Sequence, residues 1–136
     1  MLTLFTNRYQ EFQPAQGVPV RITVGAPRFR LSYVLGGAVR ELAPRRDYLK
    51  ESREKFTAAY RADLDRLGAP AVAQLLQPIA QRAGDHRLVL LCFEDLSRPG
   101  EWCHRSVFAT WWKEVTGDDV RELSPGADSY EQGTLM

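Results

Sequence analysis

The chain has 136 residues, 44% of them hydrophobic and 26% charged, a balance that indicates one globular domain and excludes a disordered, collagen-like or disulfide-stapled chain. Eighteen Lys and Arg residues against 17 Asp and Glu residues leave a net charge of +1, so no overall field draws the protein to nucleic acid or to an anionic membrane. No apolar run approaches the roughly 20 residues that a membrane-spanning helix needs, and the amino terminus lacks a signal-peptide pattern. We therefore expect a cytoplasmic protein with no membrane partner.

Two strands are expected near the amino terminus. Residues 2–5 form a short apolar run that ends before Asn7, and residues 17–24 alternate between apolar and other side chains. The apolar positions of the second segment share one face, and they are Val18, Val20, Ile22 and Val24.

Residues 25–46 then lose any regular pattern and form a long loop, with room for a short strand or turn inside it. A connection of about 20 residues in a compact domain is usually functional or disordered. This one carries too many large apolar side chains to be disordered, so we expect it to cover part of the fold. It also carries five arginines, which are Arg28, Arg30, Arg40, Arg45 and Arg46.

These arginines suit a phosphate or a single-stranded nucleic acid if their side chains converge. The alternative is that they, with Arg21, form surface ion pairs with Glu41, Asp47 and Glu51, and we favour this interpretation.

Two helices should follow the loop. Residues 47–67 carry an apolar stripe at helical spacing, and Asp47 is predicted to cap the helix. A second helix begins near Pro70. Pro78 lies inside it and removes one helical hydrogen bond, so this helix should bend or break near residues 74–77.

The carboxyl-terminal half should hold a strand, a helix and a last short strand. Residues 87–93 contain a continuous apolar run, which indicates a central strand covered on both faces. A third helix follows Gly100, and its paired aromatic residues Trp111 and Trp112 are expected in the core rather than as a base-stacking platform. Residues 120–123 form the last strand, and residues 124–136 are expected to be a loosely ordered tail.

Helices that separate strands, with a doubly apolar strand in the middle, predict an α/β fold: a small, mostly parallel sheet covered by helices, in a single domain over residues 1–123. The order of the strands cannot be derived from the pattern. Ligands of such folds commonly bind beyond the carboxyl ends of the strands.

Chemically versatile residues gather after the central strand, at the start of the third helix. They are Cys92, Glu94, Asp95, Glu101, Trp102, Cys103, His104 and Arg105. The unpaired N–H groups and positive dipole at the start of a helix favour a thiolate, which makes Cys103 the better nucleophile candidate. The same N–H groups with Arg105 can instead hold a phosphate or carboxylate, and we favour anion binding over covalent catalysis.

Other roles for these residues remain open. Cys92 lies within an apolar strand, where a free cysteine usually packs as a small hydrophobe. Zinc ligands would be Cys92, Cys103 and His104 with a carboxylate, but the ten-residue gap between the cysteines matches none of the compact zinc-site spacings. His86 marks the opposite end of the sheet. We therefore expect no metal and no cofactor.

The pattern Leu-Leu-Cys92-Phe-Glu94, a short loop and Cys103-His104-Arg105 at the start of a helix resembles the bacterial, archaeal and phage proteins grouped as domain of unknown function 488. The order of the other segments is similar over most of the chain. Residues 25–46 look like a branch found in actinobacterial and phage members, so ligand contacts from this loop do not carry over. The resemblance implies an α/β domain in which these residues lie near one another, and it implies no established activity.

Two hypotheses follow. In the first, the chain is an enzyme or a former enzyme that binds an anionic small molecule, such as a nucleotide or phosphosugar, at the start of the third helix. Cys103 would be the nucleophile or an oriented thiol, His104 an acid/base or an orienting group, and Glu94 a general base. The ligand-binding candidates are Arg105, Cys92, Asn7 and Arg30. In the second, the chain is a non-enzymatic interaction protein that binds a protein or nucleic acid through residues 25–46.

Overall fold

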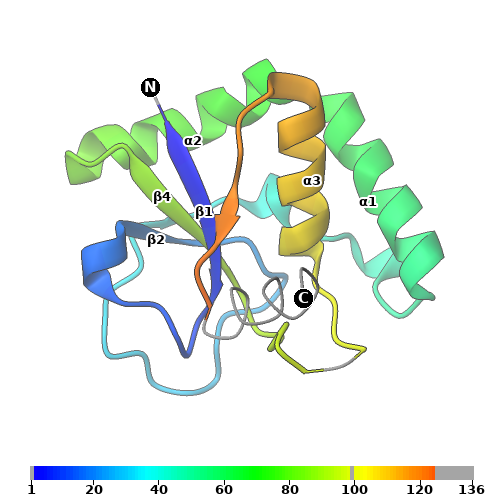
Figure 1. The fold of residues 1–136 in the computed structure, drawn as a ribbon, viewed down its shortest axis with the longest axis horizontal. Coiled ribbons are helices and arrows are strands. Elements are labelled where there is room, and N and C mark those ends of the chain that lie inside the picture. Colours follow the sequence, from blue (N-terminus) through cyan, green and yellow to red (C-terminus); the bar gives the residue numbers. More distant parts are fainter. Residues whose placement is uncertain (1, 99, 125–136) are drawn as a thin grey trace, which may run out of the picture.

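A computed structural model describes residues 2–98 and 100–124, and it contains one five-stranded parallel sheet (Figure 1). The strands lie in the order β3-β2-β4-β1-β5, and every pair is parallel. Their bounds are β1 Thr3–Arg8, β2 Val18–Arg21, β3 Gly37–Ala38, β4 Arg87–Cys92 and β5 Arg121–Glu122. The predicted α/β class, the parallel sheet and the central position of β4 are confirmed.

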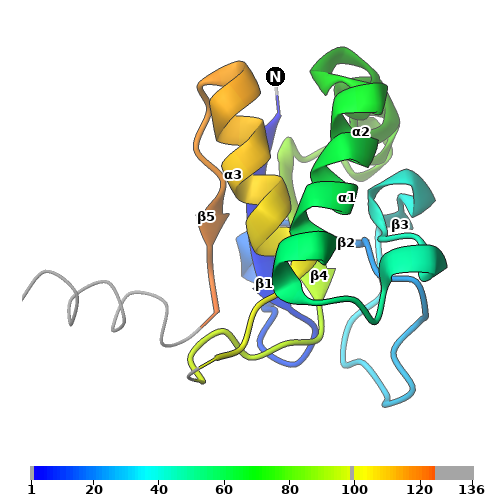
Figure 2. The ribbon, with the colours of Figure 1, turned by 90° about the vertical axis from the view of Figure 1, so that its right-hand side faces the viewer.

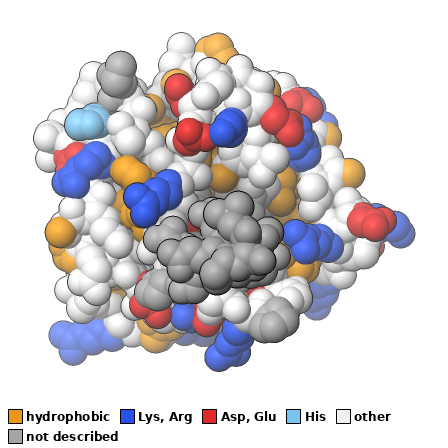
Figure 3. Space-filling view, viewed as in Figure 1, with side chains coloured by type: hydrophobic (Ala, Val, Ile, Leu, Met, Phe, Trp, Pro, Cys, Tyr) orange, Lys and Arg blue, Asp and Glu red, His pale blue; other side chains and the backbone are white. Residues whose placement is uncertain are grey.

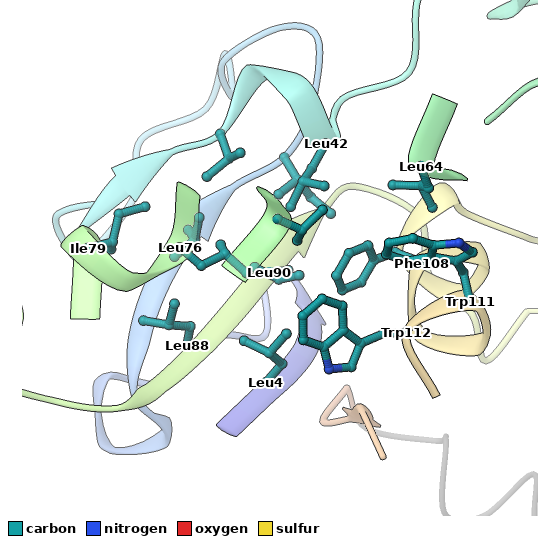
Figure 4. Packing of buried hydrophobic residues seen from close by; sticks show 14 of the residues in the cluster. Leu4, Leu42, Leu64, Leu76, Ile79, Leu88, Leu90, Phe108, Trp111 and Trp112 are labelled. Carbon is teal, nitrogen blue, oxygen red and sulfur yellow. The ribbon is translucent and has the colours of Figure 1, made fainter. Parts of the chain in front are cut away.

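Three α-helices cover one face of this sheet (Figure 2). They are α1 Arg53–Leu67, α2 Ala69–Ala83 and α3 His104–Thr116. Three short 3-10 helices complete the described elements, and they are η1 Pro14–Gln16, η2 Arg40–Leu42 and η3 Arg46–Tyr48. Leu88 and Leu90 of β4 point into the core between the sheet and the helices, where Phe108, Trp111 and Trp112 of α3 also pack (Figure 4). Both tryptophans are buried, as expected.

The other face of the sheet is covered by loops rather than by helices. Val89 and Leu91 of β4 point to this side, because side chains alternate along a strand. Leu31 and Tyr33 of the long loop pack there, and the Tyr33 hydroxyl donates a hydrogen bond of 2.7 Å to the Tyr9 carbonyl. The prediction that residues 25–46 cover part of the fold is confirmed.

Helix α1 begins later than predicted, at Arg53 instead of Asp47. The Ser52 hydroxyl caps it by accepting a hydrogen bond of 3.3 Å from the Lys55 N–H. Leu49 fits the apolar period of the helix but is 41% exposed, so burial gives no reason to extend the helix to it. Asp47 instead belongs to η3.

Helix α2 contains Pro78 without the predicted break at residues 74–77. Leu76 and Ile79 are buried in the core on either side of the proline. This packing holds the helix together although one backbone hydrogen bond is missing.

The surface carries charges of both signs (Figure 3). On the face shown in Figure 3, Lys and Arg side chains lie among Asp and Glu side chains, as the small net charge predicts. Among the described residues, no helix is long and apolar enough to cross a membrane. Ser124 is buried, and residues 125–136 lie outside the described residues, so the loose tail stays a prediction.

Candidate functional site

The site lies where β2 and β4 end and α3 begins. Cys92 is the last residue of β4, and Cys103 occupies the N-cap position of α3 without capping it through its side chain. The segment between them turns through Asp95, whose carboxylate accepts hydrogen bonds from the Ser97 backbone N–H at 3.1 Å and the Ser97 hydroxyl at 2.6 Å. This turn brings the chain back, so the two cysteines meet although ten residues separate them.

The His104 imidazole lies between the two thiols. Its Nε2 donates a 2.6 Å hydrogen bond to the carbonyl oxygen of Ile22, the residue after β2. A carbonyl oxygen can only accept, so Nε2 carries a ring proton, and in the neutral imidazole Nδ1 is the nitrogen with the lone pair. Nδ1 lies 3.4 Å from the Cys92 sulfur and 3.6 Å from the Cys103 sulfur. The edge of the Tyr60 ring packs against the imidazole, with ring centroids 5.5 Å apart.

Burial and the neighbouring groups together shift the pKa values of this cluster. Burial raises the pKa of the Cys103 thiol well above its ordinary value and outweighs the nearby imidazole, which lowers it. Burial also disfavours a charged His104, but Cys103, the Ile22 carbonyl and the Glu94 carboxylate together raise the pKa of His104. At neutral pH Cys103 is therefore a thiol, and the helix dipole that favours a thiolate is outweighed by desolvation.

Arg105 is fully buried, and its guanidinium is bound by Glu122 and the Glu94 carbonyl. Its Nε donates to Glu122 Oε1 at 2.9 Å, and its Nη2 donates to Glu122 Oε2 at 3.1 Å and to the Glu94 carbonyl at 2.8 Å. The Thr6 hydroxyl donates to the same Glu122 carboxylate at 2.6 Å. This network ties the first turn of α3 to β1 and β5, so the geometry gives Arg105 a structural role. Its predicted role as anion anchor stays a prediction.

A pocket of about 420 Å³ opens in front of Cys103, His104 and Glu94. One carboxylate oxygen of Glu94, Oε2, is buried and has no hydrogen-bond partner among the described residues. The rest of the lining is mostly aromatic and apolar, and it includes Val24, Leu49, Phe56, Phe93 and Trp102. The pocket therefore combines a large apolar wall with a few convergent polar groups, as small-molecule sites do.

A second hollow of about 850 Å³ adjoins the pocket and shares Glu101, Trp102 and Cys103 with it. Three arginines line the second hollow, and they are Arg53, Arg61 and Arg98. Trp102 and Cys103 thus stand at the boundary between an aromatic pocket and an arginine-lined hollow.

The other predicted ligand-binding residues lie outside these hollows. Asn7 is buried in β1, where its Nδ2 donates to Gln16 Oε1 at 3.0 Å and its Oδ1 accepts from the Arg8 N–H at 2.8 Å. Arg30 is exposed on the long loop, and Cys92 is fully buried behind His104. The structure therefore brings together Cys92, Cys103, His104 and Glu94, and leaves Asn7 and Arg30 apart.

The sequence pattern already places Glu101 and Trp102 among the notable residues at the start of the third helix, directly before Cys103. It does not single out Arg53 or Glu122 as site residues. Arg53 and Glu122 come from distant segments, and no local pattern connects them to the site.

One of the comparisons with known proteins shows the family of this chain. The chain belongs to the family described as Domain of unknown function DUF488, whose model matches residues 25–112. The match includes the long loop, β4 and most of α3, and it leaves out β1, β2 and β5. No curated protein and no solved structure matches the chain significantly.

Proposed function

We propose that the chain is an enzyme that binds a nucleotide-like molecule across the two adjoining hollows at the start of α3. The observation that carries this proposal is the position of Cys103, which lines both the aromatic pocket and the arginine-lined hollow. A bound molecule that fills both hollows passes over the Cys103 thiol.

The aromatic pocket suits the base of a nucleotide better than a bare phosphate. Trp102, Phe56 and Phe93 offer ring faces and edges on which a base can stack, whereas Glu94 and Glu101 are the charged side chains of the lining. Two carboxylates repel an anion but accept hydrogen bonds from the amino groups of a base.

The arginine-lined hollow suits the phosphate, because its three arginines outnumber its two carboxylates, Glu101 and Glu122. Arg61 is held by Glu114 in an exposed ion pair, and Arg98 lies 3.7 Å from Asp95. Arg53 forms no ion pair with any described residue. Its planar guanidinium can donate two parallel hydrogen bonds to a phosphate. Arg53 therefore supplies the anion contact that the sequence pattern assigns to Arg105.

The catalytic roles follow from position. His104 Nδ1 takes up the Cys103 proton, because its lone pair faces the thiol while Nε2 is bound to Ile22. Glu94 lines the same pocket with an unpartnered buried oxygen and serves as the general base. Once its proton has moved to the imidazole, the Cys103 thiolate can attack an electrophilic atom of the bound molecule, and the group displaced from that atom leaves with the proton that His104 returns.

Calorimetric titration with adenosine monophosphate tests the proposal. The Arg53→Ala variant should weaken binding by about 10- to 150-fold, because a charge-assisted hydrogen bond contributes about 1.5–3 kcal/mol. The matched control is Arg82→Ala, since Arg82 is exposed near the end of α2 and lines neither hollow. Equal affinity of the wild type and the Arg53→Ala variant would reject the phosphate contact.

One observation favours a second candidate function, that of an interaction protein. In the long loop Val34 is 89% exposed and Phe29 is 39% exposed, near the exposed Arg28 and Arg30. Exposed apolar groups beside arginines suit a protein or a single-stranded nucleic acid. Under this alternative, Arg30→Ala weakens capture of a labelled oligonucleotide or partner protein and Cys103→Ala leaves it unchanged.

A cytoplasmic location is part of the proposal. Both cysteines are free and buried, as expected in a reducing compartment.

A further inference from the structure

We propose that Cys92, Cys103 and His104 bind a zinc ion at the inner end of the aromatic pocket. The Sγ atoms of the two cysteines and a ring nitrogen of His104 all lie within 4.8 Å of one another, and all three residues are buried. They come from two separate elements, β4 and the start of α3, which the fold itself brings together.

The distances fit one tetrahedral ion. Zinc binds thiolate sulfur at about 2.3 Å and imidazole nitrogen at about 2.0–2.1 Å, which places each sulfur about 3.5 Å from the nitrogen. The sulfurs of Cys92 and Cys103 lie 3.4 and 3.6 Å from Nδ1 of His104. Two thiolates and one imidazole form a soft ligand set that selects zinc over magnesium or calcium.

The surroundings of His104 support a role as a metal ligand. A ligating histidine usually donates its other ring N–H to a carbonyl or carboxylate, which fixes the tautomer and the ring orientation. Here Nε2–H donates to the Ile22 carbonyl at 2.6 Å, so Nδ1 is the nitrogen that faces the sulfurs. The Tyr60 ring packs edge-on against the imidazole and limits its movement.

One adjustment accompanies binding. The Cys92 sulfur also lies 3.5 Å from Nε2, so it stands off the direction of the Nδ1 lone pair. A small rotation of the imidazole or of the Cys92 side chain brings both sulfurs and Nδ1 to one ion. Binding of Zn²⁺ by the two thiols releases two protons to solvent, and the imidazole binds in its neutral form.

Three protein ligands leave a fourth position on the ion. Because Cys103 and His104 both line the pocket, this position is expected on the pocket side, where Glu94 also lies. Sites with three protein ligands, including the Cys₂His set, are typical of catalytic zinc. In the zinc-bound protein Cys103 is a metal ligand and no longer a nucleophile, so zinc replaces the nucleophilic role of Cys103 in the proposed function. Zinc binding itself does not depend on nucleotide binding.

Cobalt substitution of the full chain tests the site directly. The wild-type protein, prepared reduced and free of metal, should bind one equivalent of Co²⁺ and develop the thiolate-to-cobalt charge-transfer bands and intense visible bands of a tetrahedral site. Zinc should displace the cobalt. A spectrum of six-coordinate cobalt without thiolate bands would overturn the proposal.

Variants assign the ligands. Cys92→Ser and Cys103→Ser should each weaken zinc binding by at least about 100-fold, more than the loss typical of an outer-shell mutation. The control is His86→Gln, because His86 lies just before β4, at the other end of that strand. Full zinc affinity in both cysteine variants overturns the assignment of the ligands. If a variant does not fold, the cobalt spectrum of the wild-type protein still tests the zinc site. Titration of the zinc-free and zinc-loaded proteins with adenosine monophosphate measures nucleotide binding separately. The zinc site and the nucleotide site can therefore be rejected independently of each other.

Discussion

Arg105 and Glu122 form a buried two-bond ion pair, with Nε to Oε1 at 2.9 Å and Nη2 to Oε2 at 3.1 Å. The pair joins the residue after His104 to the last strand of the sheet, and Thr6 of β1 donates to the same carboxylate. The pair therefore anchors the first turn of α3, which also carries His104, to the sheet.

Removal of the Glu122 charge should destabilise the protein. Glu122→Gln leaves the Arg105 charge buried without its partner, and we expect the free energy of unfolding to fall by about 3 kcal/mol at pH 7 in urea denaturation. The control is Glu114→Gln, which breaks an exposed ion pair with Arg61 and should cost less than about 1 kcal/mol. Equal losses in the two variants would contradict a buried, structural pair.

The same pair predicts an acid response. Burial alone would raise the pKa of Glu122, but the hydrogen bond and charge of Arg105 outweigh burial and hold this pKa below its usual value. The ionised Glu122 carboxylate therefore contributes its full stabilisation above the pKa of an unfolded glutamate, about 4.3. This contribution to the free energy of unfolding is lost as the pH falls through the lower pKa of the folded state. Between pH 5 and pH 3 the wild type should lose more stability than Glu122→Gln. Parallel losses would contradict a lowered pKa.

The start of α1 supplies a matched pair of capping variants. Ser52→Ala removes the side chain that accepts from the Lys55 N–H and should cost about 1 kcal/mol of stability. Asp47→Ala removes the cap that the sequence predicted but that the structure places in η3, and it should change stability by less than about 0.5 kcal/mol. Thermal or urea unfolding measures both changes in stability. A larger loss for Asp47→Ala than for Ser52→Ala would support a helix that begins at Asp47.

Thiol labelling should separate the two cysteines. Cys103 is 2% exposed and lines both hollows, whereas Cys92 is fully buried. With a chelator present at pH 7, a small alkylating agent should label Cys103 before Cys92. The rate at Cys103 should still be at least about tenfold lower than in the urea-unfolded chain, because burial raises the pKa of its thiol. Mass spectrometry identifies the labelled site. Equal rates at both cysteines, or a Cys103 as fast as in the unfolded chain, would argue against this arrangement.

Gly17 is required where η1 leads into β2. Its φ of 141° lies in a region that favours glycine, and an added Cβ would stand 2.6 Å from the Arg87 carbonyl oxygen. Gly17→Ala should therefore cost about 2 kcal/mol or more, because that oxygen belongs to the backbone. Gly25→Ala is the control, since a Cβ there meets no atom within 4 Å. Similar melting temperatures for the two variants would contradict this reasoning.

The sequence predicts those elements that burial governs. The run from Leu88 to Cys92 is apolar without alternation because the strand is covered on both faces, by helices on one side and loops on the other. The start of α1 is less predictable, because Leu49 fits the helical period but is exposed. Strand order depends on which edges pair, and a hydrophobic pattern carries no such information.

The same limit applies to the site. The motif around Cys103 identifies the start of α3 as a place for chemistry, and the spacing of Cys92 and Cys103 argues against a compact zinc motif. Spacing along the chain does not measure distance in space, because the turn at Asp95 returns the chain to the end of β4. The local pattern also does not show that Glu122, which lies 17 residues further on, binds Arg105.

Co-crystallisation with adenosine monophosphate tests the central claim most directly. The account predicts adenine in the pocket against Trp102, the phosphate toward Arg53 and the connecting sugar over Cys103. A nucleotide bound on the exposed loop of residues 25–46, or crystals that show no bound nucleotide at millimolar concentration, would contradict it.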